Sequence, residues 1–480
     1  METRFRSVFL DGSWQRPDSN ELITVRSPAT EEEVGFAPRC SLTDVDRAVD
    51  STSRAFGARD GWSRWEPERR ADVLDRLADV LGRRAGRIAR LISSENGMPV
   101  SLSAPVEGAG PPRLLRYYAE LIRKTEPEEC RPALTGSGST IVRREPAGVV
   151  AAVVPWNYPA TLTMFKLAPA LAAGCTVVLK PAPETVLDAC VLAEAVAEAG
   201  LPDGVVNVVP GDGHVGAHLV AHPGVDKVSF TGSTTTGRAI ARVCGGLLRP
   251  ATLELGGRSA AIVLDDADLA TAIPGLIGTA LVNSGQTCFA NTRILAPRGR
   301  YAEVLEAVTA ATGDLVLGEP LDRATQIGPL VSRRQRDRVE SFIESGLATG
   351  ARLTTGGRRP AGFGRGWYLE PAVFGDVVPG SALAREEIFG PVLTVQPYAD
   401  VSEAVALADD SDYGLAGTVW TADPQRGLDV ARRVHTGTFG VNGYSLDHGA
   451  PFGGVKSSGL GRELGPEGLD AYLRLKSIYR

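Results

Sequence analysis

Residues 149–180 read VVAAVVPWNYPATLTMFKLAPALAAGCTVVLK, and this stretch decides the fold. It opens with a short apolar run, Val149–Val154, passes through apolar residues at helical spacing, Leu162–Ala173, and closes with a second apolar run, Thr176–Leu179. The two runs predict strands, and the spacing between them predicts a helix. Parallel strands need a crossover connection between them, so the stretch predicts a parallel β-α-β unit.

The same rhythm continues downstream. Further strand-like runs are Val205–Val209, Val225–Phe230 and Ala260–Leu264, and further helical segments are Thr185–Ala199 and Val215–Ala221. This alternation predicts an α/β fold with a parallel sheet covered by helices on both faces, and a doubly wound, Rossmann-like cofactor domain is the natural candidate. Two upstream helical segments, Asp44–Phe56 and Glu66–Glu95, are expected to pad this domain.

A second α/β domain is predicted after Gly257. A chain of 480 residues exceeds the roughly 250–300 residues of one core, so two or three domains are expected. The boundary near residues 254–260 places Glu254 and Cys288 close to an interdomain cleft, where ligand sites form. The helical segments of this half are Ala302–Ala311, Ser332–Ser345, Ser402–Ala408 and Pro424–Val434. Its strand-like segments are Val392–Pro397 and Gly417–Thr421.

Bulk composition narrows the class of protein. The net charge of −6 offers no field suited to nucleic acid or an anionic membrane, so neither is an expected partner. The longest apolar runs are far shorter than the roughly 18 residues of a membrane span, and the N-terminus lacks the apolar core of a signal peptide. The six cysteines are scattered without a Cys-x-x-Cys spacing, which fits reduced thiols. We expect a cytoplasmic protein.

Two residues flanked by glycines are candidates for the chemistry. Cys288 ends Asn283-Ser-Gly-Gln-Thr-Cys288, and Glu254 opens Glu254-Leu-Gly-Gly257. A thiol attacks carbonyl carbon and a carboxylate takes protons, so the pair offers a nucleophile and a base for acyl chemistry. An ordinary thiol has a pKa near about 8.5, so Cys288 needs help from a base or local dipoles. Without the flanking motifs, a buried structural cysteine and a surface glutamate would be the simpler interpretation.

Two further segments follow predicted strands. Asn157, in Pro155-Trp-Asn-Tyr-Pro159, offers an amide that could stabilise an oxyanion together with the Cys288 N–H, although a turn asparagine between prolines is the alternative. Phe230-Thr-Gly-Ser-Thr234 lies where a strand ends and a helix begins. Helix N-termini present unpaired N–H groups to phosphates. On its own, this pattern is equally compatible with an ordinary helix cap.

Taken together, the motifs resemble those of the NAD(P)-dependent aldehyde dehydrogenase superfamily, in its hydrolytic branch. The catalytic signature is Glu254-Leu-Gly-Gly257 followed by Gly285-Gln-Thr-Cys288, and the other motifs occur in family order and at family spacing. They are Pro155-Trp-Asn-Tyr-Pro159, Lys180-Pro-Ala, Phe230-Thr-Gly-Ser-Thr234, Glu387-Ile-Phe-Gly-Pro391 and Pro451-Phe-Gly-Gly454.

The resemblance implies an aldehyde dehydrogenase fold with three parts. Residues 1–124 and 146–253 would form the NAD(P)-binding domain, and residues 254–457 the second, catalytic α/β domain. Residues 125–145, a small β excursion, would pair with 458–480 as the oligomerisation segments. A homodimer or homotetramer is expected on the same analogy.

The resemblance also implies the roles of individual residues. Cys288 would be the nucleophile, Asn157 the oxyanion donor and Glu254 the base, with Glu463 and Lys166 on a proton path. The cofactor would be held by Pro155, Trp156, Lys180, Gly232, Ser233, Gly237, Leu255, Gly256, Glu387 and Phe389. The substrate tunnel would be lined by Tyr158, Leu162, Phe165, Thr287, Phe289, Leu446 and Phe452, which are mostly apolar or aromatic and include no arginine.

The expected activity is oxidation of a medium-sized apolar or aromatic aldehyde to its acid through a cysteine thiohemiacetal and acyl thioester. Two alternatives remain. A coenzyme A acylating dehydrogenase generally lacks the base that Glu254 provides here, and an inert structural protein of this fold would show eroded motifs. NADH formation from an aldehyde, with and without coenzyme A, separates the three.

Departures from the family pattern affect the choice of cofactor. Many members carry a glutamate three residues after the Lys180 position, where it holds the ribose diol and repels a 2′-phosphate. Here that position is Pro183, followed by Glu184. We expect NAD because Glu184 keeps a negative charge nearby, and NADP is left open. Two more departures are Arg258, in place of a lysine, and Gly440, in place of a tryptophan.

No metal is predicted. His214, His218 and His222 stand four residues apart and would share a helix face at metal-ligand spacing. No acidic or cysteine ligand accompanies them in the sequence, so an ordinary helical surface is the preferred interpretation. His448, near Pro451-Phe452, is a candidate for the mouth of the substrate tunnel.

Overall fold

The predicted strand, helix and strand of residues 149–180 form the centre of the first domain in the computed structural model, which describes residues 3–480. β7 (Val149–Val153) leads into α5 (Pro159–Ala173) and then β8 (Thr176–Lys180), and the two strands pair in parallel. α5 begins at Pro159, because the fixed φ of proline suits the first helical turn and its missing N–H costs nothing there. The predicted parallel crossover is confirmed.

The first sheet has six strands in the order β19-β11-β10-β7-β8-β9, and only β19 runs antiparallel to its neighbour. The chain moves outward from β7 to β8 and β9 on one side and returns to β10 and β11 on the other. This reversal makes a topological switch point between β7 and β10, where a crevice forms at the carboxyl ends of the strands. The remaining strands are β9 (Val206–Val208), β10 (Lys227–Thr231), β11 (Ala251–Glu254) and β19 (Gly459–Leu460).

Helices cover both faces of this sheet, because successive strand residues point to opposite sides. In β7, Val149, Ala151 and Val153 join one apolar core, and Val150 and Ala152 join the other. The first core lies under α1 (Leu42–Gly57), α7 (Gly213–Ala221) and α8 (Thr234–Gly246). The second lies under α5, α6 (Val186–Ala199), α2 (Pro67–Asn96) and α4 (Gly110–Lys124).

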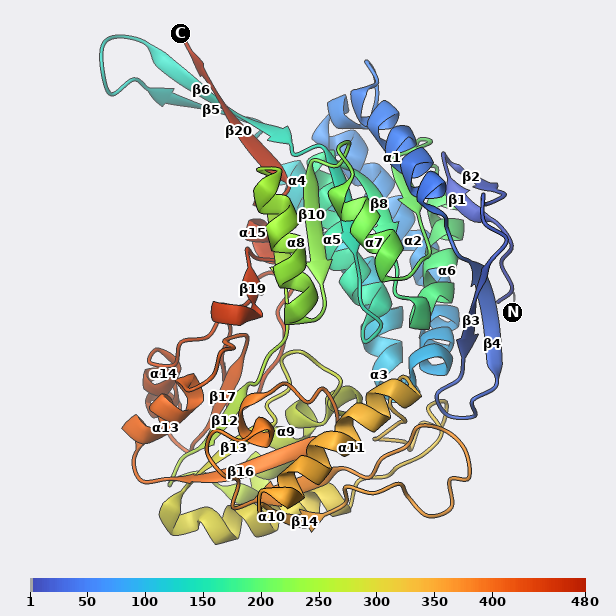
Figure 1. Cartoon of the computed structure of the whole chain (residues 1–480). Helices are drawn as coiled ribbons and strands as arrows, with labels where there is room; N and C mark the ends of the chain where they lie inside the picture. Colours follow the sequence, from blue (N-terminus) through green and yellow to red (C-terminus); the bar gives the residue numbers. More distant parts are fainter. Residues whose placement is uncertain (1–2) are drawn as a thin grey trace.

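The second domain lies below the first in Figure 1 and contains a seven-stranded sheet in the order β14-β15-β16-β13-β12-β17-β18. Its strands are β12 (Ala260–Val263), β13 (Arg293–Pro297), β14 (Arg352–Thr355), β15 (Ala372–Gly375), β16 (Val392–Tyr398), β17 (Gly417–Trp420) and β18 (Gly440–Val441). Its helices are α9 (Leu269–Ala280), α10 (Tyr301–Gly313), α11 (Arg333–Ala348), α12 (Ala382–Arg385), α13 (Val401–Asp409) and α14 (Pro424–Ala431). The run at Ala260–Leu264, which continued the rhythm of the first domain in sequence, is therefore a strand of the second sheet.

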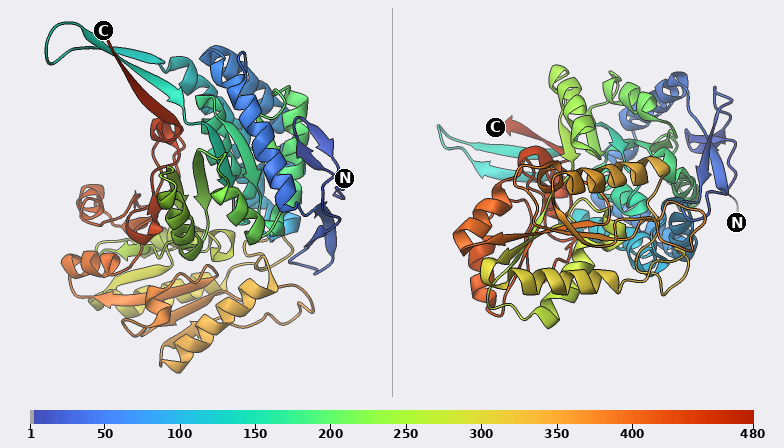
Figure 2. Two further views of the ribbon diagram at one scale, coloured as in Figure 1. Left: turned by 45° about the horizontal axis from the view of Figure 1, so that its top comes forward. Right: turned by 60° about the horizontal axis from the view of Figure 1, so that its bottom comes forward.

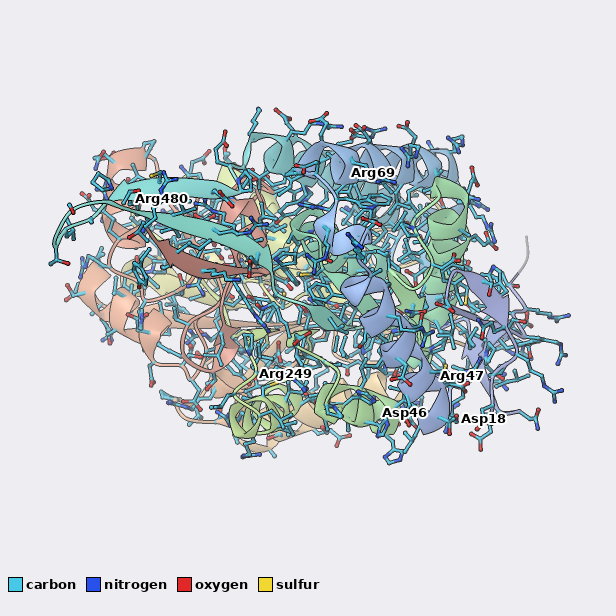
Figure 3. All side chains as sticks on the ribbon, turned by 90° about the horizontal axis from the view of Figure 1, so that it is seen from above. Asp18, Asp46, Arg47, Arg69, Arg249 and Arg480 are labelled. Carbon is cyan, nitrogen blue, oxygen red and sulfur yellow. The ribbon has the colours of Figure 1, made fainter. Side chains whose placement is uncertain are left out.

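A three-stranded sheet projects from the body as an arm (Figures 1 and 2). Its strand order is β20-β6-β5, and all neighbours are antiparallel. Viewed from above, Arg480 on the arm and Asp18 beside the N-terminal strands lie on opposite sides of the molecule (Figure 3). The arm strands are β5 (Glu128–Pro132), β6 (Ser139–Pro146) and β20 (Leu473–Tyr479).

The boundary at residue 458 needs correction. β19 pairs with β11 in the first sheet, and α15 (Gly465–Asp470) packs against α5, so only the end of the 458–480 segment belongs to the arm. Two small hairpins precede α1: β1 (Val8–Leu10) with β2 (Ser13–Gln15), and β3 (Leu22–Arg26) with β4 (Glu33–Pro38). The short turns are η1 (Trp62–Arg64), α3 (Val100–Ser103), η2 (Ala104–Gly108), η3 (Pro183–Thr185), η4 (Val282–Gly285), η5 (Arg298–Arg300) and η6 (Lys456–Ser458).

Candidate active site

The switch point between β7 and β10 opens into a cavity of about 330 Å³. Asn157 enters it from the loop after β7, Gly232 and Ser233 from the turn after β10, and Cys288 from the second domain. The cavity therefore lies between the two α/β sheets. The lining residues are Pro155, Trp156, Asn157, Thr231, Gly232, Ser233, Leu255, Gly256, Cys288, Arg334, Gln335, Arg338, Glu387 and Phe389.

A second cavity of about 310 Å³ continues along the carboxyl ends of β8 and β10. It shares Pro155, Thr231 and Gly232 with the first, so the two cavities form one elongated cleft. Lys180 and Pro183 line this far end. A cleft with two compartments that meet at the turn after β10 has the form that a dinucleotide needs.

The turn between the compartments lies at the N-terminus of α8. Ser233 is the N-cap of α8, and its hydroxyl accepts the N–H of Thr236, which leaves the other early N–H groups of this helix without intrahelical partners. Gly237 lies in the first turns of α8, where a Cβ would clash with the side chain of Leu255. Gly237 thus acts through close packing and does not line the cleft itself.

Left-handed backbone presents Cys288 to the cavity. Asn283, Ser284 and Gly285 have φ values of 50°, 56° and 72°, and a Cβ at Gly285 would clash with the carbonyl of Gly390. A Cβ at Gly257 would likewise clash with the Cys288 carbonyl. The glycines flanking both motifs are thus required by close backbone approach.

The Cys288 thiol is strongly protonated in this environment. Burial, together with the charges of the Glu387 and Glu254 carboxyl groups, raises the pKa of Cys288 to about 12. A thiol in this state is a weak nucleophile until a base or a nearby positive charge intervenes. The expected need for help is therefore larger than the sequence alone indicated.

Asn157 is held by its neighbours on both sides. Its Nδ2 donates to the Gln286 carbonyl at 3.0 Å, next to the cysteine loop. Its own carbonyl accepts Nδ2 of Asn283 at 3.0 Å and Nδ2 of Asn96 at 3.3 Å. One N–H of the Asn157 amide is thus engaged, and its second N–H is available to a ligand in the cavity.

Glu254, Glu463 and Lys166 form one buried cluster behind the cavity. Lys166 Nζ lies 2.7 Å from Glu463 Oε1 and 2.6 Å from Thr231 Oγ1, and both charged side chains are fully buried. Burial, and then the charge of Glu463, raises the pKa of Glu254 well above its usual range, while Lys166 opposes this effect. A Cβ at Gly453 would lie 2.6 Å from Glu254 Oε1, so the glutamate packs against bare backbone.

Glu387 and Phe389 lie across the cavity from the turn after β10. Glu387 Oε1 accepts the Gly257 N–H at 3.0 Å, and burial raises the pKa of this carboxyl to about 7. A Cβ at Gly256 would clash with the same carboxylate. The Phe389 ring stands edge-on to Trp156, with 5.4 Å between the ring centroids, so two aromatic faces border the pocket.

Lys180 reaches the far compartment but is turned toward the backbone. Its Nζ donates to the Pro181 carbonyl at 2.7 Å, and burial lowers the pKa of this ammonium to about 8. Beside it, Glu184 lies 3.8 Å from Arg334 of α11, across the cleft. The carboxylate therefore stays close to the adenosine end of the cleft, although it is one residue removed from the position that the family uses.

The residues expected to form the tunnel pack together beside Cys288. Tyr158, Leu162, Phe165 and Phe452 belong to one buried apolar cluster, and Cys288, Phe289 and Leu446 pack against it. The Tyr158 hydroxyl lies 2.8 Å from Thr287 Oγ1, and the rings of Phe165 and His448 meet edge-on at 6.1 Å. Six of the seven predicted residues thus belong to or pack against one apolar wall, and Thr287 joins it through its contact with the Tyr158 hydroxyl.

Several residues at the site were missed by the sequence analysis. Tyr444 stacks on Phe289, with 4.9 Å between the ring centroids, and Arg334, Gln335 and Arg338 of α11 line the cofactor cavity. The α11 segment has the charged composition of a solvated helix, so nothing in its sequence distinguishes the face that covers the cleft. The tyrosine stands in a loop without regular spacing.

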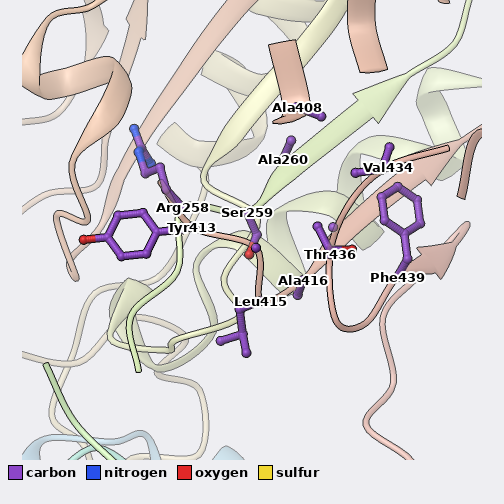
Figure 4. A pocket seen from close by; sticks show the side chains of 12 residues that line it. Arg258, Ser259, Ala260, Ala408, Tyr413, Leu415, Ala416, Val434, Thr436 and Phe439 are labelled. Carbon is purple, nitrogen blue, oxygen red and sulfur yellow. The ribbon is translucent and has the colours of Figure 1, made fainter. Parts of the chain in front are cut away.

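The departures Arg258 and Gly440 have structural explanations. The Arg258 guanidinium is buried and donates to the Leu383 carbonyl at 2.7 Å, and burial lowers its pKa to about 9. It borders a cavity of about 10 Å³ inside the second domain, shown in Figure 4, which has room for roughly one water molecule and none for a substrate. A Cβ at Gly440 would clash with the Gly443 carbonyl, so this loop excludes any larger residue.

The three histidines His214, His218 and His222 do have an acidic neighbour, contrary to the prediction from sequence. Asp46 of α1 lies 2.6 Å from His218 Nε2 and 3.4 Å from His222 Nε2, a contact that the distance in sequence concealed. Within residues 3–480, no group of three or more His, Cys, Asp or Glu side chains is arranged to hold a metal ion. Every helix of the same residues is too short or too polar to cross a bilayer.

Fold and site together define a dinucleotide-dependent enzyme with a cysteine nucleophile. The chain belongs to the aldehyde dehydrogenase family: the pattern described as "Aldehyde dehydrogenase family" matches residues 14–478. The predicted family, fold class and enzyme class are thereby confirmed.

Individual relatives support the same assignment. The chain is 53% identical to geranial dehydrogenase of Castellaniella defragrans, in an alignment that covers 98% of each chain. It is 41% identical to 3-succinoylsemialdehyde-pyridine dehydrogenase of a Pseudomonas species, in an alignment that covers 99% of this chain and 98% of the relative. Among solved structures, it matches a Mycobacterium tuberculosis aldehyde dehydrogenase complexed with NAD+ with a TM-score of 0.97 and 45% identity. This match covers 100% of the present chain and 99% of the other. It also matches a mutant aldehyde dehydrogenase C of Pseudomonas syringae in complex with NAD+ and octanal, with a TM-score of 0.94 and 40% identity. This match covers 98% of the present chain and 96% of the other.

Proposed function

We propose that the chain oxidises medium-sized apolar or aromatic aldehydes to carboxylic acids with NAD as the electron acceptor. One observation carries the proposal: Cys288 and Asn157 line the same cavity as Gly232, Ser233 and Glu387. A nucleophile, an oxyanion donor and a dinucleotide cleft therefore meet in one place.

The residues of the cleft fit a dinucleotide. The N-terminus of α8 suits the pyrophosphate, and the rings of Trp156 and Phe389 border the compartment nearest Cys288. When bound, NAD accepts the hydride that leaves the substrate carbon. The negative charge of Glu184 near the far compartment favours NAD over NADP, and initial rates with each cofactor test this choice.

Each catalytic side chain has a defined task in this proposal. Cys288 Sγ bonds to the aldehyde carbon after its proton has passed to solvent, and the free N–H of Asn157 and the Cys288 N–H hold the carbonyl oxygen as it becomes negative. Loss of the hydride leaves an acyl thioester on Cys288. Glu254 then takes a proton from water, the water oxygen bonds to the acyl carbon, and the sulfur leaves with the acid released. Lys166 and Glu463 provide a buried route for the proton taken up by Glu254.

The apolar wall beside Cys288 supports the substrate class. Tyr158, Phe165, Phe289 and Phe452 offer aromatic surface, and no arginine is among the predicted tunnel residues. The similarity to geranial dehydrogenase and to a protein crystallised with octanal agrees with this chemistry.

A substrate panel tests the proposal directly. NADH formation is measured with geranial, octanal and benzaldehyde, and with betaine aldehyde and a phosphorylated aldehyde as charged comparisons. Higher kcat/KM for the apolar aldehydes is expected, with no requirement for coenzyme A. Preference for a charged aldehyde would refute the substrate class, and strict dependence on coenzyme A would refute the hydrolytic branch.

We also propose that the arm builds a homodimer or homotetramer. Its apolar side chains Leu475, Ile478 and Tyr479 are 68%, 40% and 82% exposed. A group of large apolar side chains exposed on one strand is typical of a surface that another protein chain covers. Light scattering on the intact chain and on a chain that ends at Tyr472, and so lacks β20, tests this assignment, since loss of this arm strand should yield monomers. All six cysteines of the described residues are free thiols, which supports a cytoplasmic location.

A further inference from the structure

The loop that carries Asn157 is fixed from behind by two buried side chains that do not line the cavity. Asn96 ends α2, and Glu107 lies in the π-helical turn η2. Their exposed fractions are 1% and 0%. They contact the two ends of one short segment, residues 156–161, and Asn157 lies in this segment.

Asn96 holds the beginning of the segment. Its Nδ2 donates to the Trp156 carbonyl at 3.1 Å and to the Asn157 carbonyl at 3.3 Å, while its Oδ1 accepts the Met98 N–H at 2.9 Å. Because both ends of the amide are engaged, the side chain has one orientation. It therefore fixes the peptide on either side of Asn157.

Glu107 holds the end of the segment. Its Oε2 accepts the N–H groups of Ala160 and Thr161 at 2.9 and 3.3 Å, in the first turn of α5. The N-cap residue of α5, Tyr158, makes no side-chain cap hydrogen bond, so the carboxylate from η2 replaces the usual cap. A negative group at this position also interacts favourably with the helix dipole.

Between these two anchors, the Asn157 side chain has little freedom. One of its amide N–H groups is directed to the Gln286 carbonyl, so the direction of the second follows from the position of the backbone. An oxyanion donor is effective only when it is already aimed where charge develops. Small displacements of a positioned group cost large factors in rate.

We propose that Asn96 and Glu107 are positioning residues that aim the Asn157 amide at the reacting oxygen. The inference rests on the proposed role of Asn157 as oxyanion donor. Removing one anchor should lower the rate of the first turnover by on the order of 10-fold, less than the ~10² to 10³-fold expected for loss of the donor itself.

The test is a pair of double-mutant cycles on the full-length protein. N96A and E107A are each measured alone and combined with N157A, and the readouts are the first-turnover rate of NADH formation and the affinity for NAD. With Asn157 present, each anchor variant should be slower at unchanged NAD affinity. With N157A present, the same substitutions should change the rate by less than about twofold, because no amide remains to be aimed.

A matched control comes from the neighbouring cap of α6. Glu95 is also a buried carboxyl, and its Oε1 accepts the Leu187 N–H at 2.9 Å, but it forms no hydrogen bond to residues 156–161. E95A should therefore retain the first-turnover rate even if it loses stability. The conservative variants N96D and E107Q, which keep shape and part of the hydrogen bonding, serve where an alanine variant fails to fold, and E107Q should recover most of the rate.

The outcomes are distinct. Losses that add fully to that of N157A, an equal loss in E95A, or no loss in either anchor variant would overturn the inference. A normal rate in N157A alone would instead overturn the proposed role of Asn157.

Discussion

Replacing Lys166 by methionine tests the buried cluster behind the cavity. Lys166 is the cation hydrogen-bonded to Glu463, at 2.7 Å, and neither side chain reaches solvent. Methionine keeps the length of the chain but removes the charge, so Glu463 stays buried without its partner and close to Glu254. Breaking a buried ion pair in this way costs about 3–5 kcal/mol in the free energy of unfolding.

The double variant separates charge from packing. Lys166→Met combined with Glu463→Leu removes both charges and retains apolar volume, and such replacements are often close to neutral. We therefore expect urea unfolding at pH 8 to show a large loss for the single variant and recovery of most of it in the double variant.

The same substitution has a kinetic consequence. Lys166 opposes the rise in the pKa of Glu254, so its removal should raise that pKa further and move the pH profile of acyl-enzyme hydrolysis to higher pH. Stopped-flow release of acid after a single turnover measures this profile. A stability loss below about 1 kcal/mol, no recovery in the double variant, or an unmoved profile would refute the reasoning.

Three further predictions address single groups. Glu254→Gln should leave a burst of one NADH per active site and slow steady turnover by about 10²–10⁴-fold, because hydrolysis lacks its base; equal loss of the burst would contradict this. Burial raises the pKa of Glu107 from 4.5 to about 7, so the native chain loses folding free energy as pH rises across that window. In urea unfolding, Glu107→Gln should therefore gain about 3 kcal/mol of stability relative to the native chain between pH 4.5 and 8. A difference that stays constant with pH would contradict this prediction. In a Cys130→Ser background, alkylation of Cys288 followed by mass spectrometry should rise about tenfold per pH unit from pH 7 to 10, since its pKa is about 12, and a plateau near pH 8 would exclude that value.

The fold was predictable where a pattern is local. β7 and β8 are runs of apolar residues buried on both faces, and the helix between them has no competing interpretation. β11 was missed because its sequence, Ala251-Thr-Leu-Glu254, mixes polar and apolar residues, and its neighbour β19 comes from the far end of the chain. α4 was missed because Gly110-Pro-Pro112 reads as a break, although prolines are tolerated in a first helical turn.

The site was predictable where glycines and reactive groups stand together in a motif. Cys288 and Glu254 were identified in this way, and Asn157 because its motif follows a predicted strand. Asn96, Glu107 and Tyr444 were not, because each acts through contacts with residues distant in sequence. The acidic neighbour of the three histidines was missed for the same reason, since Asp46 comes from another helix.

Burial has opposite effects on the two reactive groups at this site. It raises the pKa of Cys288, which keeps the thiol protonated and unreactive, and it raises the pKa of Glu254, which makes the carboxylate a stronger base whenever it is charged. Burial thus lowers the reactivity of the free thiol and, at the same site, strengthens the base that hydrolysis of the acyl thioester requires. Glu463 and Lys166 act on Glu254 in opposite directions. The buried ion pair is therefore the element that sets how strong this base is, independently of the residues that touch substrate.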